Sequence, residues 1–495
     1  MIKVGFITNY FIFLFSKSKQ PPIRTLKKTV RWVIGIILGI YIGTIILLNI
    51  PYIQRNMTTF VTKELSRTLG TELTIGKIDI GLLNRIIIDD VLLDDQSGKE
   101  MLKITRLSAK FDIIPLFNGK ITISSVQLFG FNINLNKPAP HMEPNFKFVL
   151  DAFASKDTVK TKKDIDLRIN SILIRRGKLS YDVFSEEETP GKFNPQHIKL
   201  HNIIANISLK ALQNDSINAA IKRLSVDEQS GFELRKLSLK VIANNKGMKI
   251  ENFAIEMPGT EMKMDTIRME YDSLKALNHF ADNVRFSFRT LPSHVTLNDI
   301  SAFVPALSNF KEKLDLNIDV EGTLNQLNCR TLEINAGDKF RLKGDVSLQD
   351  LSRPQDAYVY GHLANLSANK EGIGFLVRNL SPHYNGVPPV LQHLGNTSFH
   401  GEISGYFTDL VMYGLFRTDI GSVQTDLKLS SDKAKALFSY SGGVKTTDFE
   451  LGQLLGNKQL GKITFNLDVR GNHYKSQYPS ITLKGLIASL EYSNY

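Results

Sequence analysis

The sequence has almost no cysteine and almost no tryptophan, with one residue of each among 495. The single cysteine, Cys329, excludes an intramolecular disulfide and any cysteine-rich zinc or iron–sulfur module. Common catalytic motifs are also missing, since the sequence contains neither a Walker loop nor a G-x-S-x-G turn. We therefore expect no cofactor, no metal and no enzymatic activity.

Two groups of residues have side chains of the types that bind metal ions, but the surrounding sequence is not that of a metal site. His197 and His201 are four apart, the spacing of a helical metal pair, but the surrounding pattern is that of a strand and the glutamate of H-E-x-x-H is missing. Asp89-Asp90 and Asp94-Asp95 could suggest cation binding, but the end of a solvated strand leading into a turn at Ser97-Gly98 explains them better. We expect a structural role for both groups.

Negative charge is absent from the first 55 residues. Eight of the 61 Lys and Arg residues lie there, which leaves 53 basic against 49 acidic side chains in the rest of the chain. The net charge of +12 is therefore mainly a property of one end. A nucleic-acid-binding protein needs its basic excess on the folded face that meets phosphate, so we expect no nucleic-acid partner.

The N-terminal region contains one long uncharged apolar run, from Trp32 to Ile53. A helix of about 20 apolar residues crosses the hydrocarbon core of a bilayer. A cleaved signal peptide is the alternative, but the run is longer than a signal core and no A-x-A site follows it, which favours an uncleaved single-pass anchor. The residues assigned to the anchor are Trp32, Ile36, Ile40, Ile46 and Leu48.

Basic residues crowd the N-terminal side of this run. Lys27, Lys28 and Arg31 carry the orientation signal, because positive residues flanking a membrane span stay in the cytoplasm. The sequence thus predicts a cytoplasmic N-terminus, with everything after Pro51 on the other side of the membrane.

The rest of the chain has the pattern of a mainly β protein with short helices. Apolar residues three and four apart between Met57 and Leu69 predict an amphipathic helix that ends at Gly70. From residue 71 the apolar residues alternate with polar ones, which predicts strands with one buried face. Short helices are predicted near residues 146–155, 298–310, 371–380 and 449–456.

A repeated segment indicates how these strands are organised. Residues 313–322 read KLDLNIDVEG and residues 462–471 read KITFNLDVRG, and a third relative, SFHGEISG, ends at Gly405. This repetition predicts an elongated, quasi-repeating antiparallel sheet. Because the sequence ends inside an alternating run, we also expect it to be truncated at the C-terminus.

The predicted division of the chain follows these patterns. It consists of a cytoplasmic basic tail (1–29), a transmembrane helix (30–53), an amphipathic helix (54–70), an N-terminal β module (71–155), a linker (156–164), a middle β segment (165–300) and repeated β units (301–495).

The alternation leaves open what covers the apolar face. A second sheet folded onto it would make a closed sandwich, which is the commoner solution for such a pattern. A taco-like sheet would instead leave an apolar groove that suits acyl chains, since each CH₂ removed from water contributes about 0.8 kcal/mol. The candidates for lining such a groove are Leu314, Leu316, Ile318, Val320, Ile463, Phe465, Leu467, Val469, Ile121 and Ile123.

Residues 73–135, together with the anchor and the helix before them, resemble the start of the AsmA-like/TamB family. The segment FELGQLLGNKQLGKITFNLDVRG (449–471) is similar to the helix-then-strand module that recurs in that family. Residues 165–300 fit only in general character. The matching positions are Asp90-Val91, Leu93, Asp95, Gly98, Leu102, Ile104, Leu107, Leu116, Gly119, Ile121, Ile123, Val126, Leu128 and Gly130.

The resemblance implies a protein of the bacterial inner membrane whose β-groove lies in the periplasm. It implies movement of phospholipid, or another acyl lipid, between the inner and outer membranes, by passive partition along the groove. The alternative is a scaffold for outer-membrane protein assembly or protein secretion with an Omp85-type partner. The sequence lacks the C-terminal domain of the family, where that partner would bind.

Overall fold

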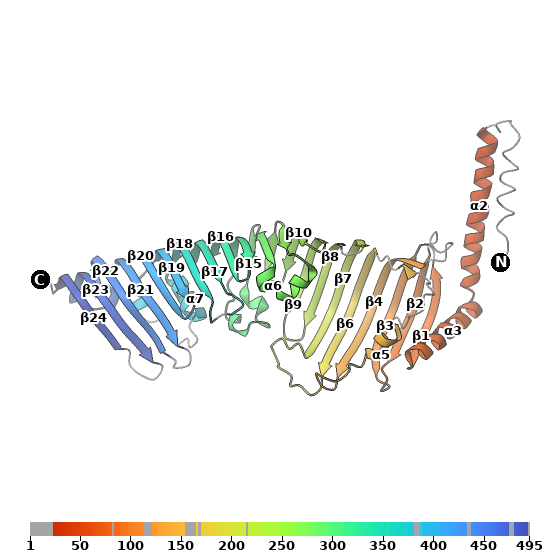
Figure 1. Ribbon diagram of the computed structural model, residues 1–495, viewed down its shortest axis with the longest axis horizontal. Coiled ribbons are helices and arrows are strands. Elements are labelled where there is room, and N and C mark those ends of the chain that lie inside the picture. The colour runs from red at the N-terminus through yellow and green to blue at the C-terminus, as the bar shows by residue number, and fades with distance from the viewer. Residues whose placement is uncertain are drawn as a thin grey trace.

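The computed structural model describes residues 23–81, 84–112, 121–153, 165–166, 170–213, 216–353, 355–380, 387, 389–432, 437–474 and 480–493. Figure 1 shows two helices at the N-terminal end, followed by a long curved sheet that extends to the C-terminal end. The predicted linker, residues 156–164, lies outside the described residues.

The first helix, α2 (Ile23–Leu48), is long and apolar enough to cross a membrane and has no buried residue in that stretch. It ends before Pro51, because the residue that precedes a proline is pushed out of the helical conformation, and Ile50 is indeed extended (φ −64°, ψ 129°). The Asn49 amide donates to the carbonyl of Ile80 (2.7 Å) and so ties the end of α2 to the sheet. The predicted span of residues 30–53 is therefore divided between two helices.

The second helix, α3 (Pro51–Leu69), has Pro51 in its first turn and ends at Gly70, whose φ of 67° is the left-handed conformation common after a helix. Two of its hydroxyl side chains, Thr58 and Ser66, face the first strand of the sheet, β1 (Leu73–Gly81). The Thr58 oxygen accepts from the Ile78 N–H (3.2 Å), and the Ser66 oxygen accepts from the Leu73 N–H (3.1 Å). Helix α3 therefore covers the outer edge of β1.

The remaining strands follow in chain order. The first group is β2 (Arg85–Asp94), β3 (Glu100–Phe111), β4 (Ile121–Lys137), β5 (Ile165–Asp166), β6 (Ser171–Val183), β7 (His197–Gln213), β8 (Ser216–Glu228), β9 (Glu233–Ala243) and β10 (Gly247–Glu256). Four short strands follow: β11 (Glu261–Met264), β12 (Ile267–Glu270), β13 (Arg285–Arg289) and β14 (Ser293–Val295). The last group is β15 (Leu314–Thr323), β16 (Gln326–Ala336), β17 (Phe340–Gln349), β18 (Tyr358–Ala368), β19 (Thr397–Tyr406), β20 (Asp409–Thr418), β21 (Gly421–Asp432), β22 (Leu437–Glu450), β23 (Leu460–Tyr474) and β24 (Ser480–Tyr492).

All these strands belong to one sheet, in which neighbours along the chain are mostly antiparallel neighbours in space. This confirms the predicted mainly β fold with an elongated antiparallel sheet. Among the exceptions, β11 and β12 both pair with β10 and not with each other, and β5 and β6 both run parallel to β4. A helix, α5 (Lys147–Phe153), lies in the connection that follows β4. The alternation of apolar and polar residues is the same in parallel and antiparallel strands, so it does not predict that β5 and β6 run parallel to β4.

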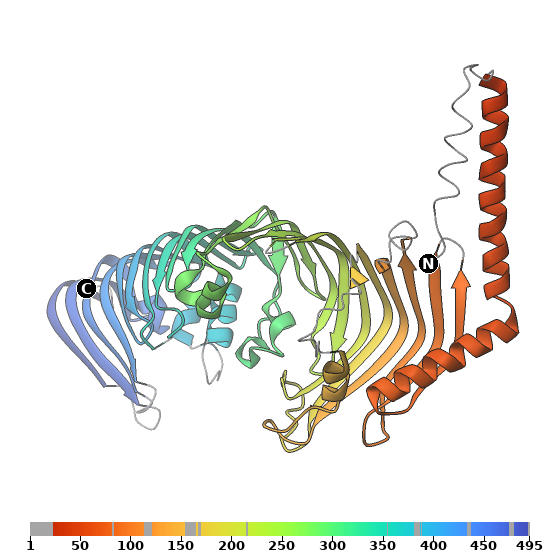
Figure 2. The ribbon, with the colours of Figure 1, turned by 45° about the vertical axis from the view of Figure 1, so that its right-hand side comes forward.

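Short helices are concentrated in the connections along one long rim of the sheet, which we call the helix rim. They are α5, η2 (Leu297–Ile300), η3 (Pro305–Leu307), α7 (Lys370–Leu380), α8 (Pro389–Gln392) and α9 (Leu451–Leu455). Only η1 (Leu274–His279) and α6 (Phe280–Asn283), among the helices of the described residues, lie in a connection of the opposite rim. Figure 2 shows the sheet curved around the helices of the helix rim.

The first strands share an interruption that we call the crease. Gly76, Asp90, Thr105, Gly130 and Arg176 lie side by side on β1, β2, β3, β4 and β6, and each is skipped in the pairing of its strand. Three of them, Asp90, Gly130 and Arg176, have positive φ. The skipped residues lie opposite one another, so the register of the pairing is the same on both sides of the crease. Within each strand, however, the alternation of buried residues shifts by one residue at this point, as between Ile75 and Ile78.

Candidate functional site: the apolar face of the sheet

Apolar side chains on one face of the sheet form continuous rows across the strands. One row crosses from β15 to β21 through directly paired residues: Leu316, Ile334, Leu342, Leu366, Phe399, Phe416 and Val423. The same row continues through Thr446, Phe465 and Ile487 to β24. Because the helices of the helix rim pack on this face and the sheet curves around them (Figure 2), the apolar face is the concave one.

Eight of the ten predicted lining residues lie on this apolar face. Four are on β15 and four on β23, in alternate positions. The most buried of them are Leu314, Val320 and Ile463, with exposed fractions of 6 to 7%. The other five are Leu316, Ile318, Phe465, Leu467 and Val469, which pair with residues of the same face.

The two lining candidates at the start of β4 are placed differently. Ile123 pairs with Phe111 of β3, but the register of the pairing between β3 and β4 shifts between Lys110 and Phe111. This shift interrupts the row of paired residues that crosses these two strands. The side chain of Ile121 lies outside the described residues, although its backbone pairs with Ile165 of β5.

No second sheet covers the apolar face in the part of the chain that the structure describes, since every named strand belongs to the one sheet. The burial of this face comes from its curvature and from the short helices at the helix rim. Ile373 and Phe375 of α7 pack on Leu314, Phe340 and their neighbours. The structure therefore has the predicted groove and not the closed sandwich.

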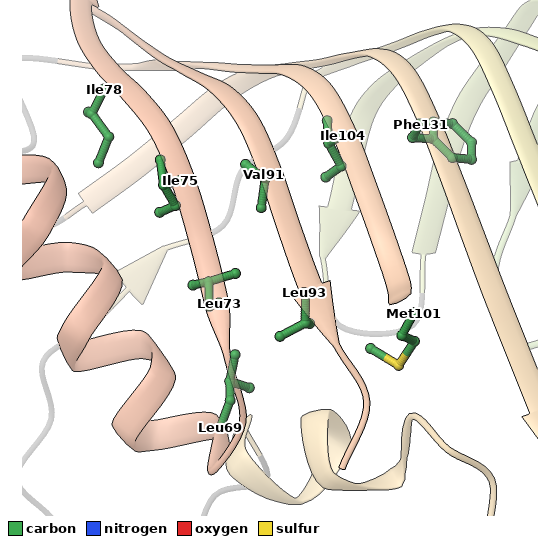
Figure 3. Close-up of a cluster of buried hydrophobic side chains, with 9 residues drawn as sticks. All are labelled: Leu69, Leu73, Ile75, Ile78, Val91, Leu93, Met101, Ile104 and Phe131. Carbon is green, nitrogen blue, oxygen red and sulfur yellow. The ribbon is translucent and has the colours of Figure 1, made fainter. Parts of the chain in front are cut away.

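The N-terminal end of the groove is filled by side chains from the helices. Leu73, Ile75, Val91, Leu93 and their neighbours form a buried cluster on the apolar face, shown in Figure 3. Half-buried side chains from α3 and α5 pack against it: Met57, Val61, Leu65, Phe148, Val149 and Ala152. Helix α3 thus closes the groove along β1.

The convex face carries charged side chains that pair across neighbouring strands. The Lys343 ammonium lies 2.7 Å from a Glu333 carboxylate oxygen, and Arg289 lies 2.6 Å from Asp319. Lys240 and Lys249 both contact Glu251 and lower the pKa of its carboxyl group to about 2. These exposed ion pairs make the convex face polar, whereas the concave face is apolar. The sheet that forms the wall of the groove is therefore amphipathic.

Asp95 does not have the role of a cation ligand. Its side chain is buried and accepts hydrogen bonds from the Ser97 N–H (2.8 Å), the Ser97 hydroxyl (2.6 Å) and the Lys99 N–H (3.0 Å). Burial acts to raise the pKa of Asp95, but these hydrogen bonds and one from Asn145 outweigh it and hold the pKa below its ordinary value. Asp95 therefore organises the turn between β2 and β3.

His197 likewise has a structural arrangement. Its Nδ1 lies 3.1 Å from an Asp182 carboxylate oxygen, and its Nε2 donates to the carbonyl of Glu186 (2.9 Å). Asp182, Glu188 and His197 form the one trio of side chains in the described residues whose atoms lie close enough to share a metal ion. Both ring nitrogens of His197 are already engaged, so we assign the trio to holding the connection between β6 and β7.

The anchor residues are exposed along α2, as expected of a helix that faces lipid. Trp32, Ile36, Ile40 and Ile46 are each more than half exposed. Leu48 is half-buried at the end of the helix. Lys28 and Arg31 are exposed, and the side chain of Lys27 lies outside the described residues.

The sequence analysis missed lining residues on β16 and β18. Ile334 and Leu366 contribute to the row described above, but their strands contain irregular pairing at Cys329–Leu332 and Leu363–Leu366. These irregularities break the alternation in the sequence. β17 alternates strictly and pairs with both β16 and β18. Its apolar residues could therefore have indicated which residues of the two neighbouring strands share their face.

Comparisons of the chain with protein-family models, with curated proteins and with solved structures gave no match.

Proposed function

We propose that the protein carries the acyl chains of a phospholipid along the groove and is not an enzyme. The observation that supports this proposal is the row of apolar residues that crosses from β15 to β24 with one polar member, Thr446, and with no second sheet on it in the described residues. An apolar surface of this extent is typically covered by a ligand or a membrane. Acyl chains fit it because their contacts need no fixed position along the groove.

The energetics favour movement along the groove without an energy source at each step. Each CH₂ group removed from water contributes about 0.8 kcal/mol, whichever strand it lies on. A chain that advances by one strand exchanges one set of aliphatic contacts for a similar set. The charged head group stays in water at an open part of the rim, which avoids the cost of burying it.

The apolar helix α2 gives the proposed location. We propose that it anchors the protein in the bacterial inner membrane with the N-terminus in the cytoplasm, because the basic residues Lys27, Lys28 and Arg31 flank its N-terminal side. The sheet would then lie in the periplasm and exchange lipid between the inner and outer membranes. The basic flank and the resemblance of residues 73–135 support this location.

Photo-crosslinking of lipid to single positions tests the proposal. Benzoylphenylalanine replaces Leu316 or Phe465 on the apolar face, and the full chain is irradiated in cells and analysed by mass spectrometry. We expect phospholipid adducts at both positions. The matched controls are Asp315 and Asn466, which are the exposed neighbours on the convex face.

The controls should give few or no adducts, because their side chains point into water. Equal adducts on both faces would indicate adventitious contact with lipid, and their absence from Leu316 and Phe465 would contradict the proposal.

A second candidate function is a scaffold for outer-membrane protein assembly or protein secretion, which the resemblance of residues 73–135 supports. Such a scaffold would bind an extended segment of another polypeptide through backbone hydrogen bonds at a strand of the sheet. An Omp85-type protein is the proposed partner.

Crosslinks from exposed positions of β24 to such a partner or to nascent barrel strands would support the scaffold. Lys484 and Leu486 are suitable positions, because both are exposed. Lipid adducts in the groove together with no protein crosslinks at β24 would contradict it.

A further inference from the structure

The convex face has a pocket of about 520 Å³ at the crease, separate from the groove. It is formed where β2, β3, β4 and β6 lie side by side. Asp89, Arg106, Phe129 and Arg175 form a directly paired row across these strands and line it. Its volume is in the range of pockets that hold small organic molecules.

A buried hydroxyl group in this pocket has no hydrogen-bond partner among the described residues. Ser108 lines the pocket with an exposed fraction of 5%, and its oxygen makes no hydrogen bond to any part of the chain that the structure describes. An unsatisfied buried hydroxyl costs about 1–3 kcal/mol, so such groups usually have a partner. A ligand atom in the pocket would provide one.

The charges of the pocket are unequally engaged. Arg106 donates from Nε (2.6 Å) and from a terminal nitrogen (3.0 Å) to the two carboxylate oxygens of Asp89, so its charge is balanced. Arg175 is exposed and makes no ion pair within the described residues. Within the described residues, Arg175 is therefore the cation of this pocket without an ion pair, and Asp90, which also lines the pocket, is the carboxylate without one.

Apolar surface accompanies these polar groups. Phe129 is 38% exposed, and Leu128 and Leu173 also line the pocket. The guanidinium carbon of Arg176 lies over the Phe129 ring, 5.3 Å from its centre, and covers one face of that ring. A ligand that matches this pocket has one anionic group beside an aromatic or aliphatic body.

We propose that this pocket binds an amphipathic organic anion, with its phosphate or carboxylate group at Arg175 and Ser108 and its apolar part on Phe129 and Leu173. The anion pairs with the guanidinium of Arg175 and accepts a hydrogen bond from the Ser108 hydroxyl. The anionic group can belong to a soluble metabolite or to a lipid head group, since both present the same chemistry. The site lies on the opposite face from the groove, so the proposal does not depend on lipid transport.

Binding of phenyl phosphate to the full chain in phospholipid nanodiscs tests the site, with saturation-transfer NMR as the readout. We expect Arg175→Gln and Ser108→Ala each to weaken binding at least about tenfold, since a hydrogen bond to a charged group contributes roughly 1.5–3 kcal/mol. Arg417→Gln is the matched control. Arg417 is exposed on β20 and forms no ion pair in the described residues.

Inorganic phosphate and phenol, each with half of the proposed chemistry, should bind much more weakly than phenyl phosphate. Equal binding of either one, no binding of phenyl phosphate, or equal loss in Arg417→Gln would overturn the proposal. The thermal unfolding of each variant is measured in parallel, so that weaker binding is not mistaken for unfolding.

Competition by dioctanoyl phosphatidic acid, added below its micelle concentration, identifies the source of the anion. Displacement of phenyl phosphate indicates a lipid head group, and no displacement indicates a soluble anion. Either result supports the proposed site, provided that Arg175→Gln has lost its binding of phenyl phosphate.

Discussion

His197 fastens the connection between β6 and β7 through a carboxylate and a backbone carbonyl. The hydrogen bond with Asp182 raises the pKa of His197, and burial opposes this only in part. A group whose pKa is higher in the folded state stabilises the fold below its unfolded pKa of about 6.5, and loses this contribution as the pH rises through the folded value.

We therefore predict that His197→Gln lowers the free energy of unfolding at pH 6 by about 1.5–3 kcal/mol, the usual contribution of a hydrogen bond to a charged group. The loss should be smaller at pH 8.5, where wild-type His197 is less protonated. Thermal unfolding at the two pH values measures this difference. His201→Gln is the control, because His201 is exposed on the same strand. An equal loss at both pH values would contradict the charged arrangement.

Gly322, which ends the first repeated segment, is required by the backbone. Its φ is 140°, and an added Cβ would overlap the carbonyl oxygen of Gln326 in the neighbouring strand. We predict that Gly322→Ala destabilises the sheet by at least about 2 kcal/mol, because neither the conformation nor the space suits a side chain. Urea unfolding followed by circular dichroism measures the effect. Gly443→Ala is the control, since a Cβ added to Gly443 would have no neighbouring atom within 4 Å, and an equal loss there would remove the explanation.

At the scale of single elements, α3 protects the edge of β1. The Thr58 and Ser66 oxygens accept hydrogen bonds from amides of that edge, and Ser66 also donates to the Leu73 carbonyl (3.3 Å). Side chains of a helix thus replace the missing neighbouring strand. An uncovered edge would be free to pair with other chains.

We predict that Thr58→Val combined with Ser66→Ala increases hydrogen exchange at the amides of Leu73 and Ile78. Each lost hydrogen bond corresponds to about 0.5–1.5 kcal/mol, or roughly a two- to tenfold faster exchange if these amides exchange by local opening. Exchange measured by mass spectrometry on peptides from β1 tests this. Thr59→Val is the control, because the Thr59 hydroxyl donates to a carbonyl within α3 itself. Unchanged exchange in the double variant would show that α3 does not protect the edge.

The elements were largely predictable from the sequence, and the crease was not. The short helices, the strands of the repeat and the turn at Ser97-Gly98 follow from local patterns, because each depends on residues close in sequence. The crease depends on unpaired residues that are aligned across β1, β2, β3, β4 and β6. Its only local sign is an apolar spacing of three in neighbouring strands, as in Ile75–Ile78 and Ile104–Leu107. The pocket at Ser108 lies at the crease, so it could not be predicted from the alternation of apolar and polar residues either.

At the scale of the whole molecule, the apolar face was predictable but its openness was not. The alternation of Leu314, Leu316, Ile318 and Val320 requires one apolar face, and both a sandwich and a groove satisfy that requirement. The choice depends on long-range curvature, to which the crease and the helices of the helix rim contribute. Neither of these is encoded in any single strand.

A lipid that enters the groove on the N-terminal side of β19 passes the later strands in series, so one obstruction should empty everything beyond it. Ile403 and Met412 are a cross-strand pair on the apolar face of β19 and β20. We predict that changing both to Asp leaves lipid adducts at Ile221 in β8 and lowers those at Phe465 in β23 at least about tenfold, because passage then brings acyl chains against buried carboxylates. Photo-crosslinking at the two positions, as described above, measures both. The matched control changes Ser404 and Val411 to Asp, a cross-strand pair on the convex face of the same strands. If adducts at Phe465 persist in the first variant, lipid reaches β23 by entering the groove along its rim beyond β20.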